Sequence, residues 1–92
     1  MIIARTIHIE GKVQGVFFRD WTVGMAREVG VSGWVRNRRN GNVEVFVVGE
    51  SAVVDRFIDR LREGSPASRV DRLHVEDGQI ERIDGFSRRQ TV

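Results

Sequence analysis

The sequence contains no cysteine, a single proline and no long apolar run. The lack of cysteine excludes disulfides, thiolate catalysis and the commoner zinc sites, and it fits a reducing cytoplasm. No apolar run approaches the roughly 20 residues that cross a bilayer. The N-terminal stretch Met1–Arg5 also lacks the basic region and the apolar length of a secretory signal. We therefore expect a cytoplasmic protein without a membrane partner.

Lysine is almost absent as well, because Lys12 is the only lysine among 15 basic residues. The net charge of +2 is modest, and acidic residues alternate with the arginines along the second half, as in Asp55-Arg56 and Asp59-Arg60. This alternation is typical of a solvated helix face rather than of a nucleic-acid stripe, so we expect no nucleic-acid partner. With 92 residues, 40% of them hydrophobic, the chain should form one domain over residues 1–92.

The spacing of apolar residues predicts an alternation of strands and helices. The predicted strands are Ile2–Glu10, Val31–Arg36, Val43–Val48 (ended by Gly49), 70–75 with a one-residue bulge, and Ile80–Arg88; the predicted helices are Phe18–Val29 and Glu50–Glu63. In the first strand the face with Ile3, Ile7 and Ile9 should meet the core, which leaves His8 half-exposed on the other face. Gly24 either allows close packing or weakens the first helix, and Gln90–Val92 should be loose.

The predicted order, β-α-β-β-α-β with an extra C-terminal strand, is that of a ferredoxin-like α+β sandwich. In this fold an antiparallel sheet is covered on one face by both helices. Its first and third strands pair at the centre, and the second strand flanks the third. The loop after the first strand therefore lies beside the end of the second strand, where Arg19 and Asn37 should meet.

That loop, Gly11–Arg19 with the sequence GKVQGVFFR, has the properties of an anion site. Gly15 allows the backbone to turn so that its N–H groups converge, and the following helix adds the positive end of its dipole. Arg19 supplies a planar cation that stays charged near neutral pH. Asp20, in the first turn of the same helix, is explained by its favourable interaction with the dipole.

The amino-acid sequence of the loop resembles the first signature of the acylphosphatase family. Further matches follow in the expected order: Gly33-Trp34-Val35-Arg36-Asn37, Gly41-Asn42-Val43, Gly49, Gly64-Ser65-Pro66 and Arg69-Val70-Asp71. The resemblance implies hydrolysis of the carboxyl-phosphate bond of a small acyl phosphate, and we expect the protein to be a monomer. It also implies that the loop cradles the phosphate, that Arg19 binds it, and that Asn37 positions the attacking water. The implied cradle consists of Gln14, Gly15, Val16, Phe17, Phe18 and Arg19.

The chemistry of such a substrate suits a site with no histidine, cysteine or well-placed carboxylate. The leaving group is a carboxylate whose pKa lies near ~4, so no general acid has to protonate it. Positioning and electrostatic stabilisation suffice. His8 and His74 lack ligand spacing, and we expect neither metal nor organic cofactor. Thr22 either supports the site or packs within the helix.

Two residues depart from the family pattern: Phe17 fills a position that is often small, and Arg38 follows Asn37 where a small polar residue is familiar. We expect them to affect substrate preference rather than the reaction. Two alternatives from other classes stay open. An RNA-binding sheet needs aromatic platforms, of which the third strand offers only Phe46. A non-catalytic module would sense a phosphate-bearing ligand with the same loop.

Overall fold

The computed structural model describes all 92 residues, with five strands and two helices in the predicted order. The elements are β1 (Ile2–Lys12), α1 (Phe18–Val29), β2 (Ser32–Asn37), β3 (Val43–Glu50), α2 (Ser51–Glu63), β4 (Arg69–Asp77) and β5 (Phe86–Arg88). Helix α1 has the predicted bounds, and it ends at Gly30, whose left-handed conformation is the usual one for a glycine that terminates a helix. Neither helix is long and apolar enough to span a membrane.

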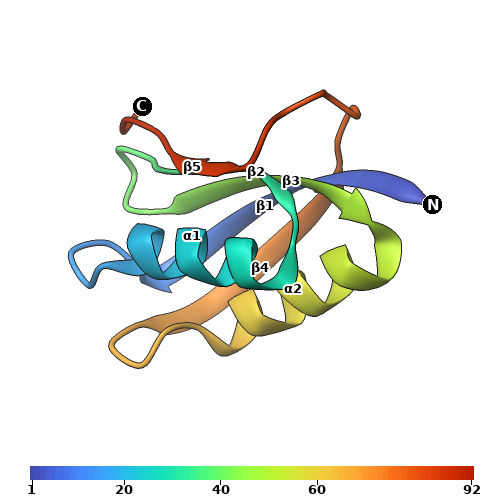
Figure 1. Cartoon of the computed structure of the whole chain (residues 1–92). Coiled ribbons are helices and arrows are strands. Elements are labelled where there is room, and N and C mark those ends of the chain that lie inside the picture. Colours follow the sequence, from blue (N-terminus) through green and yellow to red (C-terminus); the bar gives the residue numbers. More distant parts are fainter.

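The sheet has the order β4-β1-β3-β2-β5, and both helices pack on one of its faces (Figure 1). β1 is antiparallel to β3 and β4, and β2 is antiparallel to β3, as the ferredoxin-like prediction requires. The prediction of an entirely antiparallel sheet is wrong for the fifth strand, because β5 runs parallel to β2. This arrangement places β4 and β5 at opposite edges of the sheet.

The last strand is much shorter than predicted, because Phe86–Arg88 replaces Ile80–Arg88. The chain must travel from one edge of the sheet to the other, and residues 78–85 make this crossing over the face that the helices leave open (Figure 1). The N–H of Gly78 donates to the carbonyl of Ala4 at 3.0 Å, and Ile83 packs against a small cluster that includes Phe46. Of the apolar residues in the predicted strand, Ile83 therefore covers the open face, Ile80 is 62% exposed, and Phe86 belongs to β5 and the main core.

Long-range pairing also moves two other boundaries. β3 continues through Gly49, which was predicted to end it, because Ile2 and Ile3 of β1 pair with its last two residues. Helix α2 accordingly begins at Ser51 rather than at Glu50. The predicted bulge is confirmed: the pairing of β1 with β4 shifts at Gly11, and Asp71 is left without a partner across the ladder.

The main core lies between the sheet and the two helices. Ile7 and Ile9 are fully buried there and Ile3 packs against them, so the predicted core face of the first strand is confirmed. His8 is half-buried on the opposite face. Val13 and Phe18, on either side of the turn from β1 into α1, belong to this core, so the core anchors both ends of that turn.

Candidate active site

A pocket of about 250 Å³ lies where β1 ends, α1 begins and β2 ends. Its lining consists of Val13, Gln14, Gly15, Phe17, Phe18, Arg19, Asp20, Asn37 and Arg88. Arg19 and Asn37 thus line one cavity, although 18 positions of sequence separate them. Of the six predicted cradle residues, Val16 does not line the pocket, and its side chain packs against the main core instead.

The loop from β1 to α1 turns through two residues with positive φ. Gly15 has φ 72°, and Phe17, the N-cap residue of α1, has φ 59° and ψ 27°. The N–H groups of residues 14–17 donate to no backbone carbonyl, and no side chain caps the first turn of the helix. Unsatisfied donors at a helix N-terminus form a site for an anion, because the N–H groups and the dipole act together.

Phe17 is the only residue other than glycine with positive φ. A bulky residue in this region costs about 1–3 kcal/mol, and such strain is found at binding sites where the surroundings enforce it. The carbonyl of Phe17 accepts from the N–H of Trp21 at 3.1 Å, which starts the helix, while its side chain stays 83% exposed. The ring therefore stands at the mouth of the pocket.

The guanidinium of Arg19 has no carboxylate partner. Its one polar contact is a long one, from Nη1 to the carbonyl of Arg89 at 3.4 Å. Asp20, the next residue, pairs with Arg88 instead, with 2.9 Å between Nη1 and Oδ1. The positive charge of Arg19 is thus left available for a ligand.

Asn37 is the last residue of β2, and its backbone carbonyl accepts from the N–H of Val92 at 3.2 Å. The side-chain oxygen Oδ1 is buried and has no hydrogen-bond partner. A buried amide oxygen without a partner is costly, by about 1–3 kcal/mol, unless a water or ligand donates to it. A residue of the pocket wall, Asn37, therefore carries an acceptor without a partner, in the same wall as Arg19.

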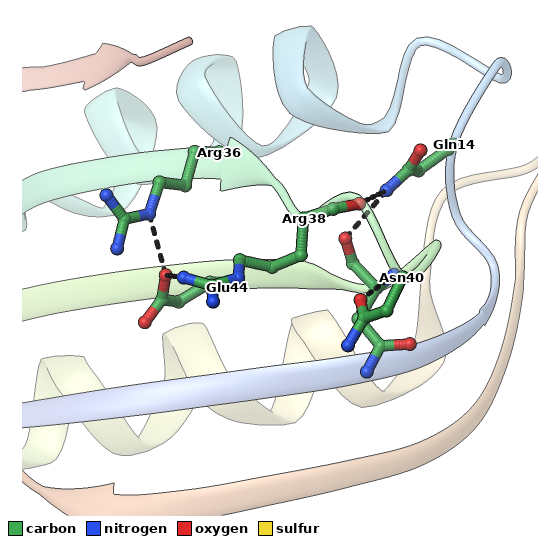
Figure 2. A network of polar contacts seen from close by, with 6 residues as sticks. Gln14, Arg36, Arg38, Asn40 and Glu44 are labelled. Carbon is green, nitrogen blue, oxygen red and sulfur yellow. Dashed lines mark hydrogen bonds and ion pairs between the residues drawn. The ribbon is translucent and has the colours of Figure 1, made fainter. Parts of the chain in front are cut away.

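The side chain of Gln14 joins the two halves of the site (Figure 2). Its Nε2 donates to the carbonyls of Arg38 and Asn42, at 2.8 Å each. Both carbonyls belong to the turn between β2 and β3, so the glutamine ties the anion loop to the hairpin that carries Asn37. This role of the side chain was not predicted, because backbone acceptors leave no signal in the sequence.

Arg38 points away from the pocket, to which it contributes no wall. Its Nη1 lies 3.2 Å from Oε1 of Glu44, and the same oxygen accepts from Nε of Arg36 at 2.7 Å (Figure 2). The Glu44 side chain is 11% exposed, so this three-residue network is partly buried and connects the two strands of the hairpin. Of the two departures from the family pattern, only Phe17 stands at the pocket.

Sequence reasoning missed the contribution of the C-terminal end. Arg88 lines the pocket, and the tail beyond it is bound along β2 rather than loose as predicted. The N–H of Arg89 donates to Val35 at 2.8 Å, and the N–H of Arg39 donates to Val92 at 2.9 Å. Both hydrogen bonds join backbone groups, so the pattern of side chains in the sequence does not predict them.

Three polar residues lie outside the pocket. Thr22 is buried, and its hydroxyl donates to the carbonyl of Phe18 at 2.9 Å. Of the two roles considered for this residue, support of the site or packing within the helix, the contact corresponds to packing within the helix. His8 and His74 stand opposite one another on β1 and β4. No group of three or more histidine, cysteine or acidic side chains is arranged to hold a metal ion.

The open face of the sheet presents an aromatic pair, Trp34 stacked on Phe46 with 6.0 Å between ring centroids. The guanidinium groups of Arg36 and Arg89 lie over the Trp34 ring, 4.6 and 4.9 Å from its centre. Ile83 packs against the same cluster. These rings are engaged within the protein, unlike the free platforms on which RNA bases stack.

Comparison with known proteins gives one consistent result. The family profile described as Acylphosphatase matches residues 5–88. An acylphosphatase of Rhizorhabdus wittichii is 53% identical over 90 residues, which cover 98% of this chain and 91% of the relative. The solved structure of an acylphosphatase from Coxiella burnetii has a TM-score of 0.91 at 33% identity, with 96% and 93% of the two chains covered. For the acylphosphatase from Bacillus subtilis the TM-score is 0.89 at 33% identity, with 95% and 97% covered.

Proposed function

The chain belongs to the acylphosphatase family and hydrolyses carboxyl-phosphate bonds; from this premise we propose that Arg19 and the loop 14–18 bind the phosphoryl group while Asn37 holds the attacking water. One observation carries the assignment. Two residues of the same pocket wall each carry a group without a partner: the guanidinium of Arg19 has no carboxylate partner, and Oδ1 of Asn37 is buried without a hydrogen bond. The first group can bind an anion, and the second needs a hydrogen-bond donor.

The phosphoryl oxygens fit the cationic side of this pocket. The N–H groups of residues 14–17 and the first turn of α1 supply several donors, and the planar guanidinium supplies two more in a fork that matches two oxygens. These donors neutralise the charge that spreads over the oxygens in the transition state. Because they are fixed before the substrate arrives, little reorganisation is needed at the moment of reaction.

The water fits beside Asn37. Oδ1 of Asn37 accepts a hydrogen bond from the water and so orients the lone pair of the water oxygen toward phosphorus. A bond forms between that oxygen and phosphorus while the bond from phosphorus to the carboxyl oxygen breaks, and both bonding electrons leave with the carboxylate. The water proton passes to the phosphate oxygens or to solvent, so the products are carboxylate and inorganic phosphate.

No residue of the pocket has to act as a general base or acid in this step. The carboxylate leaves as an anion because its pKa lies near ~4. Asparagine does not titrate, and the guanidinium stays charged throughout the neutral range. The proposed step therefore uses neither cofactor nor metal.

We propose that the enzyme acts as a monomer on a small acyl phosphate in the cytoplasm. Every residue in the proposed step comes from one chain, which supports a monomer. The cytoplasmic location is supported by the absence of cysteine. The engaged state of Trp34 and Phe46 argues against RNA as a partner.

Two measurements test the roles of the pocket. Binding of inorganic phosphate, followed by calorimetry, should be lost in Arg19→Ala and kept in Asn37→Ala; Arg56→Ala, on the exposed surface of α2, is the control. Hydrolysis of benzoyl phosphate in ¹⁸O-water should place the label in phosphate. Label in benzoate would mean attack at the carbonyl carbon, and unchanged phosphate binding in Arg19→Ala would remove this arginine from the site.

A further inference from the structure

A carboxylate lines the pocket that binds an anion. Asp20 follows Arg19 directly in the first turn of α1, and both residues belong to the pocket wall. The carboxylate favours the start of the helix through the dipole, but it repels any phosphate bound a few ångströms away. A negative charge at this place therefore needs a reason why it does not weaken substrate binding.

The structure supplies a partner for it from the opposite end of the chain. Arg88, in β5, donates from Nη1 to Oδ1 of Asp20 at 2.9 Å. The two residues stand 68 positions apart, and both line the pocket. Their side chains are 51% and 59% exposed, so the pair adds little to the stability of the fold, as is usual for surface ion pairs.

We propose that Arg88 is a positioning residue that neutralises Asp20 and so keeps the pocket attractive to the phosphoryl group. This inference rests on the proposed role of Arg19 in binding phosphate. With the pair intact, the charges of Arg19, Arg88 and Asp20 leave one positive charge at the pocket. Without Arg88 the local charge is zero, and an unpaired carboxylate stands beside the bound phosphate.

The pair acts through charge rather than through contact with the substrate. Interactions between partly exposed charges are screened over about 10 Å at 0.1 M salt, so the effect is largest at low ionic strength. Asp20 and Arg19 are neighbours in the helix, and side chains at positions i and i+1 do not face each other. Asp20 is therefore held by β5, and the guanidinium of Arg19 remains available.

The test is a double-mutant cycle on Arg88→Ala, Asp20→Asn and the double variant, with phosphate binding and the KM for benzoyl phosphate measured at low and high salt. Arg88→Ala should weaken phosphate binding and raise KM about threefold to tenfold at low salt, with kcat changed less. High salt should reduce this loss. The double variant should return to within about twofold of the native values, because it no longer carries the carboxylate.

The control is Arg60→Ala, which removes a similar surface pair with Glu28 on the two helices, at 3.8 Å. It should leave phosphate binding unchanged. If the double variant binds phosphate as weakly as Arg88→Ala, then Arg88 contacts the substrate itself and the neutralising role is wrong. If Arg88→Ala binds like the native protein, the pair has no role in the site. Failure of the proposed function would appear elsewhere, as native phosphate binding in Arg19→Ala.

Discussion

The replacement Gln14→Met removes the link between the anion loop and the hairpin that carries Asn37. Methionine has a similar length and no donor, so the change isolates the two hydrogen bonds from Nε2, each 2.8 Å long. Neither acceptor is left without a partner, because the carbonyl of Arg38 also accepts from Gly41 and that of Asn42 accepts from Arg38. The cost is then the net value of two hydrogen bonds, about 1–3 kcal/mol, without a further desolvation penalty.

For a domain of this size, such a loss lowers the midpoint of thermal unfolding by roughly 4–24 °C. The effect on catalysis should exceed the effect on stability. Untied, the hairpin no longer fixes Asn37 against the loop, and a displacement of about 1 Å in a positioned group can cost on the order of 100-fold in rate. We expect kcat to fall by about tenfold to 100-fold in protein that is still folded.

Urea denaturation and benzoyl phosphate hydrolysis at saturating substrate measure the two effects on the same samples. Gln79→Met is the matched control, because this glutamine is exposed in the segment that crosses the open face. It should change neither quantity. If Gln14→Met kept both the native stability and the native kcat, the contacts of Gln14 with the hairpin (Figure 2) would have no part in assembling the site.

Further predictions concern the frame around the site. Gly24→Ala should stabilise the protein by about 0.5–1 kcal/mol, because nothing lies within 4 Å of the added carbon in α1. Gly33→Ala should destabilise it by at least about 3 kcal/mol, because the backbone there has φ 146° and the added Cβ would lie 1.8 Å from the carbonyl oxygen of Phe46. Urea unfolding measures both changes. The hydrogen bond from Arg69 lowers the pKa of Asp71 below its ordinary value of 3.8. The stabilising contribution of this carboxylate is therefore present above that value and is lost as the pH falls below it. Asp71→Asn should be slightly less stable than the native protein near neutral pH and equally stable in strong acid. Deletion of residues 90–92 removes the backbone bonds of Val92 to Asn37 and Arg39, and it should lower kcat about tenfold in assays where the protein remains folded.

Local patterns predicted those parts of the fold that local interactions determine. Helix α1 has its predicted bounds, because an apolar face at helical spacing and a terminal glycine are both encoded within 13 positions. The bulge in β4 was predicted from a one-residue shift in the alternation of its apolar residues. The predicted strand Ile80–Arg88 is mostly wrong, because residues 78–85 cross from one edge of the sheet to the other and Ile83 packs on the open face instead of pairing in the sheet.

The site divides in the same way. Arg19 and Asn37 were predicted from the loop, the topology and the family signatures, and the structure brings them to one pocket. The contributions of Gln14 and Arg88 were not predictable, because one acts on backbone carbonyls and the other on a carboxylate far away in the sequence. The order of the chain gives no indication of either contact until the strands are paired.

The most direct test of the account is the kcat of Asn37→Ala for benzoyl phosphate at saturating substrate, followed by the loss of ultraviolet absorbance. We expect kcat to fall by about 100-fold or more, with phosphate binding retained, because the pocket still holds the anion but no longer holds the water. A kcat within a few-fold of the native value, in folded protein, would contradict the assignment of the attacking water to Asn37.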